Sequence, residues 1–279
     1  MDIDSAITVY AKGVIWMDNI VIKPVGKVLA EIQDPHAMPL GGGRAIIEIY
    51  PEYQDALQGI EENSHIWILA WFHKAERDWL KTVPAKVNPD LPEYGVFALR
   101  AFNRPNPIGL CLVRLERVED NRLYVSGLDA IGGTPVIDIK PYYENDIIFS
   151  PQTPYFKGKN RRMREGFIQK HAVLHHQEEC ADLRLAVRMA AIAEDIFGKL
   201  NAADLTVEVN GSGCLADCIQ GITGAKLANP ARFTYIPSAG NGETVWRKGN
   251  NCLRITANKL FSNDEIETLA DEALFSISQ

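Results

Sequence analysis

The stretch Arg104-Pro-Asn-Pro-Ile-Gly109 leads directly into the alternating run Leu110-Cys-Leu-Val-Arg-Leu115. Each proline fixes its own φ angle and pushes the preceding residue toward an extended conformation, so the hexapeptide has little backbone freedom. Gly109 permits a close approach that a side chain would block. The pattern predicts a stiff loop, entered from residues 95–100, that presents arginine, asparagine and main-chain groups to a small polar ligand. The alternative interpretation is a proline-rich turn that only starts a strand.

Short strand patterns surround this loop in residues up to about 143. β-branched and aromatic residues are concentrated in the segments 45–50, 66–72, 96–100, 110–118, 123–126 and 136–139, with a hairpin turn at 119–122. One helix is indicated at 53–61, introduced by Pro51. These elements predict a mainly β domain built as a single closed antiparallel barrel, over residues 20–148.

A different pattern begins after a proline-containing segment at 151–160. A helical stripe contains Leu183, Val187, Ala190, Ala191 and Ile196, and strands are indicated at 205–209, 232–236 and 252–256. Ser262 and Glu265 form a capping box for a last helix ending near residue 275. We therefore expect a linker at 149–169 and an α+β domain at 170–279.

Composition indicates a globular chain without membrane spans. Of its 279 residues 46% are apolar, and the longest apolar run, Ile66 to Phe72, is too short to cross a bilayer. No basic and apolar leader is evident, so a cytoplasmic protein with no membrane partner is expected. The five cysteines are scattered and odd in number, which favours free thiols or metal ligands over disulfides.

The net charge of −7 lies entirely in the first half of the chain. Residues 1–150 contain 14 Lys and Arg against 21 Asp and Glu, whereas residues 151–279 contain 15 of each. Proteins that bind nucleic acid over a wide face normally carry a basic excess. Nucleic-acid binding is therefore not supported by charge. The basic cluster at 157–164 could contact phosphates, but it is interpreted as a solvated linker.

Several polar residues gather around the hexapeptide in the sequence. Asp138 and Lys140 are two positions apart, so a regular strand would place both on one face. An acid and a base on one wall suit a catalytic site, although a surface ion pair explains the same spacing.

These blocks together resemble the TrmO-type methyltransferases, also known as the TsaA-like or YaeB-like domain. The resemblance covers residues 22–145 and rests on Ile46-Glu-Ile-Tyr-Pro-Glu-Tyr53, Ser64-His-Ile-Trp67, residues 95–100, the hexapeptide and Thr134-Pro-Val-Ile-Asp-Ile-Lys-Pro-Tyr142. It implies a single-sheet β-barrel that works as a homodimer and binds S-adenosylmethionine. Bacterial members methylate threonylcarbamoyl-adenosine beside the tRNA anticodon.

The resemblance also implies a cofactor site. Its residues are expected to be Pro39, Leu40, Gly41, His73, Lys74, Arg100, Asn106, Leu110, Ser126, Gly127, Leu128 and Asp129. Because a sulfonium methyl is already activated, the protein must mainly align it, exclude water and supply a weak base. Asp138, with Asp129, is the candidate base or sulfonium partner, and Lys140 and Arg104 are expected to orient the substrate.

Three departures from the TrmO pattern concern the substrate more than the cofactor. The chain reads Val25-Gly-Lys where Val-Arg-Ser-Pro is usual after the early Ile-Gly, Lys74 replaces a common glutamine, and Gly132 replaces an aspartate. A basic early loop and a carboxylate are thereby lost. A small-molecule acceptor therefore competes with tRNA as an interpretation.

The second domain brings imidazole and thiol groups near one point, as zinc sites often do. His175 and His176 precede Cys180 at the start of the long helix, and Cys214 follows the strand at 205–209. The spacing alone also fits buried structural cysteines. Residues 170–260 resemble the FmdE-like domain, named after a component of formylmethanofuran dehydrogenase, which implies a metal, commonly zinc, on His176, Cys180 and Cys214. In that pattern Glu178 replaces the second histidine, and Ala181-Asp182 replaces Pro-Gly.

The sequence thus supports an S-adenosylmethionine-dependent methyltransferase. Its acceptor is either tRNA or a small molecule, free or metal-bound, held by the C-terminal domain. The competing hypothesis is a non-catalytic sensor of S-adenosylmethionine and metal.

Overall fold

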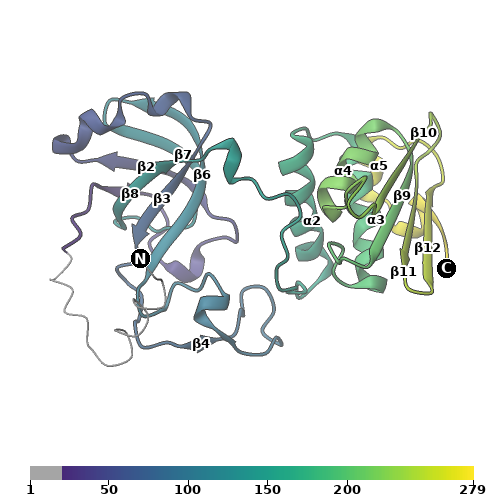
Figure 1. The fold of residues 1–279 in the computed structure, drawn as a ribbon, viewed down its shortest axis with the longest axis horizontal. Coiled ribbons are helices and arrows are strands. Elements are labelled where there is room, and N and C mark those ends of the chain that lie inside the picture. The colour runs from purple at the N-terminus through teal and green to yellow at the C-terminus, as the bar shows by residue number, and fades with distance from the viewer. Residues whose placement is uncertain (1–20) are drawn as a thin grey trace, which may run out of the picture. The chain divides into compact units, whose positions relative to one another are not determined.

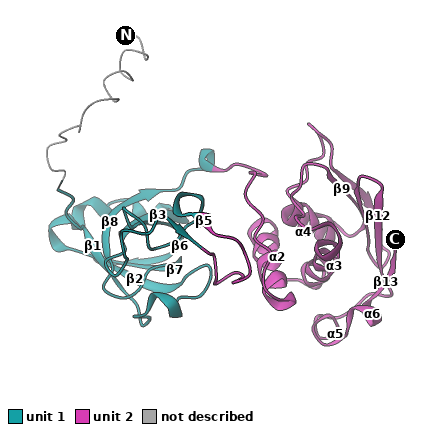
Figure 2. Ribbon diagram, turned by 90° about the horizontal axis from the view of Figure 1, so that it is seen from below, with its two compact units in different colours: residues 1–82, 95–146 teal, residues 83–94, 147–279 magenta. Residues whose placement is uncertain are grey.

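The structure, a computed structural model, describes residues 21–279 and contains two compact units (Figures 1 and 2). Unit 1 comprises residues 21–82 and 95–146, and unit 2 comprises residues 83–94 and 147–279. Residue 20, the expected start of the barrel, lies outside the described residues.

Unit 1 is a closed antiparallel barrel with the strand order β1-β2-β7-β6-β3-β8. Its strands are β1 (Gly26–Leu29), β2 (Gly43–Ile49), β3 (His65–Trp71), β6 (Ile108–Glu119), β7 (Arg122–Leu128) and β8 (Pro135–Pro141). The short strands β4 (Lys81–Thr82) and β5 (Tyr94–Gly95) lie in the long connection between β3 and β6. The predicted single-sheet barrel is confirmed.

The barrel interior is filled by every second side chain of the strands. In β6, Cys111 and Val113 are buried, whereas Ile108, Leu110 and Leu112 face outward and are 39%, 51% and 36% exposed. Successive side chains of a strand point to opposite faces, so one apolar run lines the core and also leaves an apolar outer stripe.

Two sequence expectations about unit 1 are wrong. Residues 53–61 form not one α-helix but the 3-10 turns η3 (Pro51–Leu57) and η4 (Ile60–Glu62), because Gly59 between them is left-handed with φ 81°. Residues 96–100 are not a strand, since Val96–Ala98 form the 3-10 turn η5. The other short turns are η2 (Pro35–Ala37) and η6 (Glu144–Asp146).

Unit 2 is an α+β fold, as predicted. Its sheet has the order β10-β9-β11-β12-β13, where β9 is Leu205–Gly211, β10 Phe233–Pro237, β11 Glu243–Lys248, β12 Asn251–Ala257 and β13 Phe275–Ser278. The longer helices are α2 (Arg161–His176), α3 (Ala181–Phe197) and α4 (Gly213–Thr223). These helices cover one face of the sheet, with α2 in the outer layer (Figures 1 and 2).

Helix α3 lies in the middle layer and is buried around most of its circumference. The predicted stripe continues through Ala193 and Phe197, which leaves Ile196 at its edge with 40% of its area exposed. Residues 161–169, expected in the linker, are helical instead. Asn160 caps α2 by accepting from the Met163 amide at 2.9 Å, and Ile168 is buried in the core of unit 2.

The predicted last helix is divided in two. The capping box of Ser262 and Glu265 is present at the start of α5 (Asn263–Thr268). Extended backbone at Leu269 and Ala270 then separates α5 from α6 (Asp271–Leu274). Across residues 21–279, every helix is too short or too polar to pass through a bilayer.

Candidate functional site

One end of the barrel gathers most of the predicted cofactor residues. The connections β1 to β2 and β3 to β6 leave the barrel at this end, and each joins antiparallel neighbours. The β7 to β8 connection leaves at the same end, because the end of β7 pairs with the start of β2 and the start of β8 pairs with β1. The Lys74 ammonium donates to the main-chain oxygen of Gln33 at 2.9 Å. The rings of His36 and Phe102 meet edge to face with centroids 5.7 Å apart. Side chains thus join loops that are distant in sequence.

The early loop also contacts the segment after β7. Gly42 has φ 74°, and a Cβ there would lie 2.5 Å from the carbonyl carbon of Leu128. A Cβ on Gly127 would lie 3.9 Å from the Gly41 oxygen and 3.8 Å from the Leu112 oxygen. Residues 39–41, residues 126–128 and the strand that contains Leu110 therefore meet, as the predicted cofactor site requires.

The hexapeptide is held by its own backbone and by Arg104, which was expected from the sequence to orient the substrate. The amides of Phe72 and Ile108 donate to the oxygens of Pro107 and Asn106, both at 2.8 Å. A Cβ on Gly109 would lie 2.3 Å from the tip of the Phe72 ring, so that ring packs directly on the glycine. The Asn106 side chain is exposed and available to a ligand.

Arg104 stabilises the neighbouring loop. Its guanidinium Nη2 donates to the oxygens of Val96 and Leu99, the latter at 2.7 Å, and its amide donates to the Glu76 oxygen at 3.0 Å. Its buried Nε has no hydrogen-bond partner among the described residues. The geometry thus assigns Arg104 to positioning of the loop, with one donor left over.

Arg100 and Asp129 lie close to the thiol of Cys111. The Cys111 Sγ donates to the Asp129 oxygen at 3.9 Å. Burial raises the pKa of Cys111, with a further rise from the Asp129 charge and a fall from the Arg100 charge. At His73, partial burial and the Lys74 charge lower the pKa, which favours the neutral imidazole. The cofactor candidates Arg100 and Asp129 are therefore both close to Cys111, whose raised pKa favours the neutral thiol.

Asp138 and Lys140 are on one face, as predicted, but they are not at the end of the barrel. They lie along β8, opposite Leu69 and Trp67 of β3. The Lys140 Nζ and Asp138 Oδ2 atoms are 2.8 Å apart, and both side chains are about half exposed (61% and 46%). Leu69 also pairs with Leu110 of β6, so Asp138 and Leu110 occupy one row, two strands apart, on the outer surface.

The glycine that replaces the family's aspartate has a structural reason. A Cβ on Gly132 would lie 2.5 Å from the Ala30 oxygen and 2.2 Å from the Gln33 Nε2 atom. Gln33 in turn donates to the Ala30 oxygen at 3.0 Å, and the Gly132 amide donates to the Ile32 oxygen at 2.8 Å. The loss of the carboxylate thus accompanies close packing of the early loop on this turn.

An open groove that the sequence did not predict adjoins Leu128. Its volume is about 760 Å³, and strands β2, β6 and β7 provide most of its wall, including Arg44 and Tyr124. The guanidinium of Arg117 stacks on the Tyr124 ring, 3.4 Å from its centroid. The sequence indicates the groove only through the outward positions of alternating strands. Such positions are common on protein surfaces, so they do not identify a groove.

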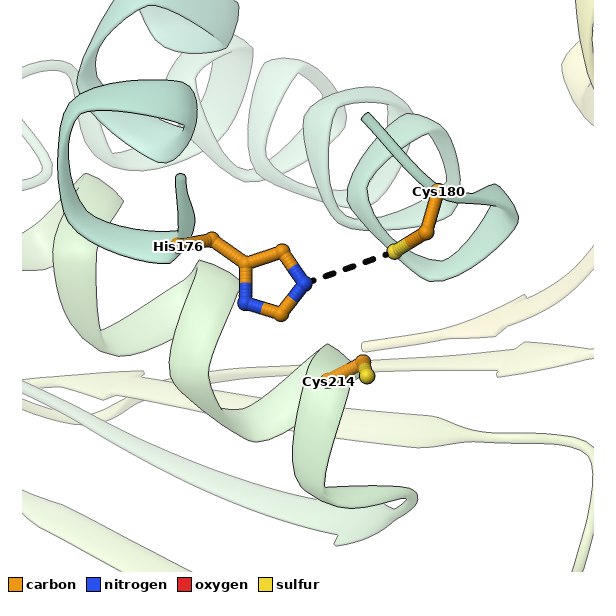
Figure 3. A group of neighbouring side chains, drawn as sticks. All are labelled: His176, Cys180 and Cys214. Carbon is orange, nitrogen blue, oxygen red and sulfur yellow. Dashed lines mark hydrogen bonds between the residues drawn. The ribbon is translucent and has the colours of Figure 1, made fainter. Parts of the chain in front are cut away.

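Unit 2 brings together the three predicted metal ligands (Figure 3). The ligand atoms of His176, Cys180 and Cys214 all lie within 4.8 Å of one another. The His176 Nε2 and Cys180 Sγ atoms are 3.5 Å apart. Desolvation and the neighbouring Cys180 raise the pKa of Cys214. The exposed Glu178 is not in this group, although its charge also acts on Cys214.

Helix starts position the thiols, and a carboxylate positions the imidazole. Cys180 is the N-cap of α3, and its Sγ accepts from the Leu183 amide at 3.4 Å. Cys214 lies in the first turn of α4. Asp217, which the sequence pattern did not single out, approaches the His176 Nδ1 atom at 2.8 Å. This contact leaves Nε2 to face the thiols, as metal-binding histidines are commonly held.

The donor set fits zinc or another borderline transition metal. Two thiolates and one imidazole are soft and intermediate ligands, and three protein ligands leave a fourth tetrahedral position open. A cavity of about 150 Å³ is lined by Asp182 and Ser212 from the same helix starts, whereas the three triad residues are not part of its wall. The Ser212 hydroxyl donates to the Asp182 carboxylate at 2.5 Å.

Comparisons with known proteins concern mainly the barrel. The tRNA-methyltransferase O N-terminal domain family matches residues 33–146. A "Probable S-adenosyl-L-methionine-binding protein" of Methanothermobacter thermautotrophicus is 47% identical over 128 residues, which are 44% of this chain and 90% of that protein. The chain belongs to the TrmO methyltransferase family. Within that family, a protein of the same description from Archaeoglobus fulgidus is 34% identical over 246 residues, 84% of this chain and 66% of that protein.

The TrmO-family relatives differ in how much of their length this chain spans. A rat "tRNA (adenine(37)-N6)-methyltransferase" is 44% identical over 115 residues, 39% of this chain and 26% of that protein. The Archaeoglobus alignment is longer than the barrel and therefore includes part of unit 2. Binding of S-adenosylmethionine by the barrel agrees with these relatives.

Proposed function

We propose that the chain transfers the methyl group of S-adenosylmethionine to N6 of threonylcarbamoyl-adenosine in tRNA. The observation that carries this proposal is the meeting of the early loop, the segment 126–129 and the Arg104 loop at one barrel end. These are the segments in which TrmO resemblance implies the cofactor site. The name of the rat relative supports an adenine in tRNA as acceptor.

The proposed chemistry needs alignment and one proton acceptor. Pro39 to Gly41, His73, Lys74 and the segment Ser126–Asp129 would hold the cofactor, while Asn106 and Arg100 face it from the hexapeptide side. Asp138, which shares an outer row with the cofactor candidate Leu110, would accept the proton of the acceptor amide, with Lys140, 2.8 Å away, keeping its carboxylate oriented. Arg104 would act through the loop carbonyls that it binds.

We also propose that the barrel works as a homodimer. The outer stripe of Ile108, Leu110 and Leu112 is exposed by about a third to a half and lies in the same rows as Asp138 and Lys140. Apolar outer stripes of this kind are more often covered than solvated. A second barrel on this stripe would enclose the row that contains the candidate base.

A second candidate function is favoured by the triad of unit 2. We propose that His176, Cys180 and Cys214 hold a metal ion whose open position accepts a small thiol or amine, and that the cavity lined by the sequence neighbours Ala181 and Leu215 holds the rest of that molecule. When bound, a zinc ion would lower the pKa of such a ligand. Asp217 fixes the His176 ring, and Asp182 with Ser212 forms the cavity wall. In this version the small molecule, and not tRNA, receives the methyl group.

An assay with a labelled methyl donor distinguishes the two proposed functions. Full-length protein is incubated with methyl-labelled S-adenosylmethionine and either bulk tRNA or a metabolite extract, and S-adenosylhomocysteine and labelled products are measured. Product with tRNA supports the first proposal, and product with the extract alone supports the second. Tight cofactor binding without turnover in either case would support a sensor and contradict both.

Metal analysis tests the triad. Cys180→Ser and Cys214→Ser should each lower the zinc content of the purified protein, because each removes a thiolate ligand. Cys252→Ser is the matched control, since Cys252 is an exposed cysteine of the same unit outside the triad. Unchanged zinc in both triad variants would refute the assignment.

A further inference from the structure

Phe97 is the most exposed large apolar side chain in residues 21–279, with 84% of its area accessible. Its neighbours are also exposed: the Val96 amide donates to the Leu80 oxygen at 3.0 Å, and Leu80 and Trp79 are 68% and 39% accessible. We call Trp79, Leu80 and Phe97 the aromatic ridge. A contiguous apolar surface of this kind is informative, because a single exposed residue is ordinary whereas a group marks a binding surface.

The backbone of the aromatic ridge is held by a buried residue and by side-chain hydrogen bonds. Val96 is only 1% exposed and anchors the turn η5 in the protein. The Arg104 guanidinium binds the oxygens of Val96 and Leu99, on either side of the ridge residue Phe97. The Trp79 indole donates to the Glu76 carboxylate at 2.7 Å. The rings are therefore presented on an ordered backbone, so a partner that stacks on them loses little entropy in ordering the loop.

The charge around the ridge opposes the acidity of the rest of the barrel. Residues 73–82 and 95–104 contain five Lys and Arg but two Asp and Glu, whereas residues 1–150 as a whole contain 14 and 21. Lys81 and Arg100 are exposed, and the Arg77 guanidinium lies 4.8 Å from the centroid of the Trp71 ring. Exposed aromatic rings among cations are the combination that binds single-stranded nucleic acid, by stacking bases and pairing phosphates.

We propose that the aromatic ridge binds an unpaired segment of RNA, with a base stacked on Phe97 and phosphates paired with Arg77 and Lys81. The proposal rests on tRNA as the acceptor. It also places the RNA next to the cofactor site, since Arg100, three residues after Phe97, acts on the Cys111 thiol beside Asp129. The cations of the rim, Arg77, Lys81 and Arg100, favour a polyanion such as RNA as the occupant.

Fluorescence anisotropy with a labelled anticodon stem-loop RNA tests the ridge. Phe97→Ala should weaken binding by between about fivefold and about 150-fold, the range of base-to-aromatic stacking. Phe97→Trp should keep wild-type affinity, because any aromatic face stacks. Tyr143→Ala is the matched control, since Tyr143 is an exposed aromatic (60%) of the same unit outside the ridge, and it should change nothing. Lys81→Ala should reduce the slope of log affinity against log salt by about 0.7.

Two further measurements distinguish failure of the ridge proposal from failure of the tRNA proposal. Calorimetric binding of S-adenosylmethionine should be the same for wild type and Phe97→Ala, and light scattering should give them the same mass. Wild-type RNA binding with an unaffected Phe97→Ala variant overturns the ridge alone. A Phe97→Ala variant that changes from dimer to monomer overturns it in favour of a protein interface. Absence of RNA binding by the wild type overturns both the ridge and the tRNA acceptor.

Discussion

Asp217 shows how one residue determines what a cluster does. Its carboxylate oxygens approach the His176 Nδ1 atom at 2.8 Å and the His175 Nε2 atom at 3.1 Å. It is three residues after Cys214 on α4, so a ligand and its support share one helix face. The grouping of His176, Cys180 and Cys214 could be predicted from the sequence but the Asp217 contact could not, because an aspartate between two cysteines has no distinguishing pattern.

Removal of that support should weaken metal binding while leaving the ligands intact. Asp217→Ala is expected to lower zinc affinity by about 10- to 100-fold, as loss of other carboxylates that orient a metal-binding histidine does. Competition with a chromophoric chelator measures the affinity. Asp204→Ala is the control, because Asp204 pairs with Lys248 away from the triad. An Asp217→Ala protein with wild-type zinc affinity would show that His176 does not depend on this carboxylate.

Gly132 provides a second prediction for a single residue. Gly132→Ala should destabilise the barrel by about 1–3 kcal/mol, because a Cβ there meets the Ala30 main-chain oxygen at 2.5 Å and the backbone must shift. Gly43→Ala is the control, since a Cβ at that position has no neighbour within 4 Å. Hydrogen exchange of barrel amides reports the free energy of opening. Equal protection in the two variants would mean that the early loop yields without cost.

At the scale of elements, alternation predicted the strands and failed where side chains from elsewhere shape the backbone. Strands β3, β6, β7 and β8 follow directly from apolar periodicity. Residues 96–100 have the same composition but form a turn, because Arg104 binds the oxygens of Val96 and Leu99. The cofactor residues are implied by the family resemblance and not by periodicity. Their spacing does not show that the three loops converge, because the closure of the barrel brings these loops together.

Helix α5 gives a prediction with a pH dependence. Bonds from Lys259 and from the Ser262 amide lower the pKa of Glu265 to about 2, against 4.5 for an ordinary glutamate. A carboxylate with a lowered folded pKa stabilises the fold above the unfolded pKa and loses this effect as pH falls toward the folded value. The melting midpoint of Glu265→Gln should therefore lie below wild type above pH ~5 and approach it as pH falls through 4.5 toward 2.

Circular dichroism melts across this range measure the difference. Glu272→Gln is the control, because Glu272 is an exposed glutamate of the neighbouring helix α6 without a capping role. A gap between Glu265→Gln and wild type that stays constant with pH would show that the charge of Glu265 does not stabilise the cap.

At the scale of the whole molecule, the two proposed ligands belong to units with separate hydrophobic cores. The barrel core and the core of unit 2 share no residue. All the net acidity lies in the first half of the sequence, yet the cations around the aromatic ridge, Arg77, Lys81 and Arg100, lie within that half. The net charge of the first half of the sequence is therefore evidence against RNA binding, whereas the positive charge around one loop is evidence for it. Only the fold shows which charges are neighbours.

Separate cores lead to a prediction about ligands. A ligand at a hundred times its dissociation constant stabilises the unit that binds it by about 2.7 kcal/mol. S-adenosylmethionine should thus raise hydrogen-exchange protection in β1 to β8 only, and zinc should raise it in α2 to α4 and the sheet of unit 2 only. Hydrogen exchange read by mass spectrometry on the full chain measures both. If S-adenosylmethionine instead raises protection in unit 2, the two sites are energetically coupled, and the acceptor bound at the metal triad becomes the better account of the chain.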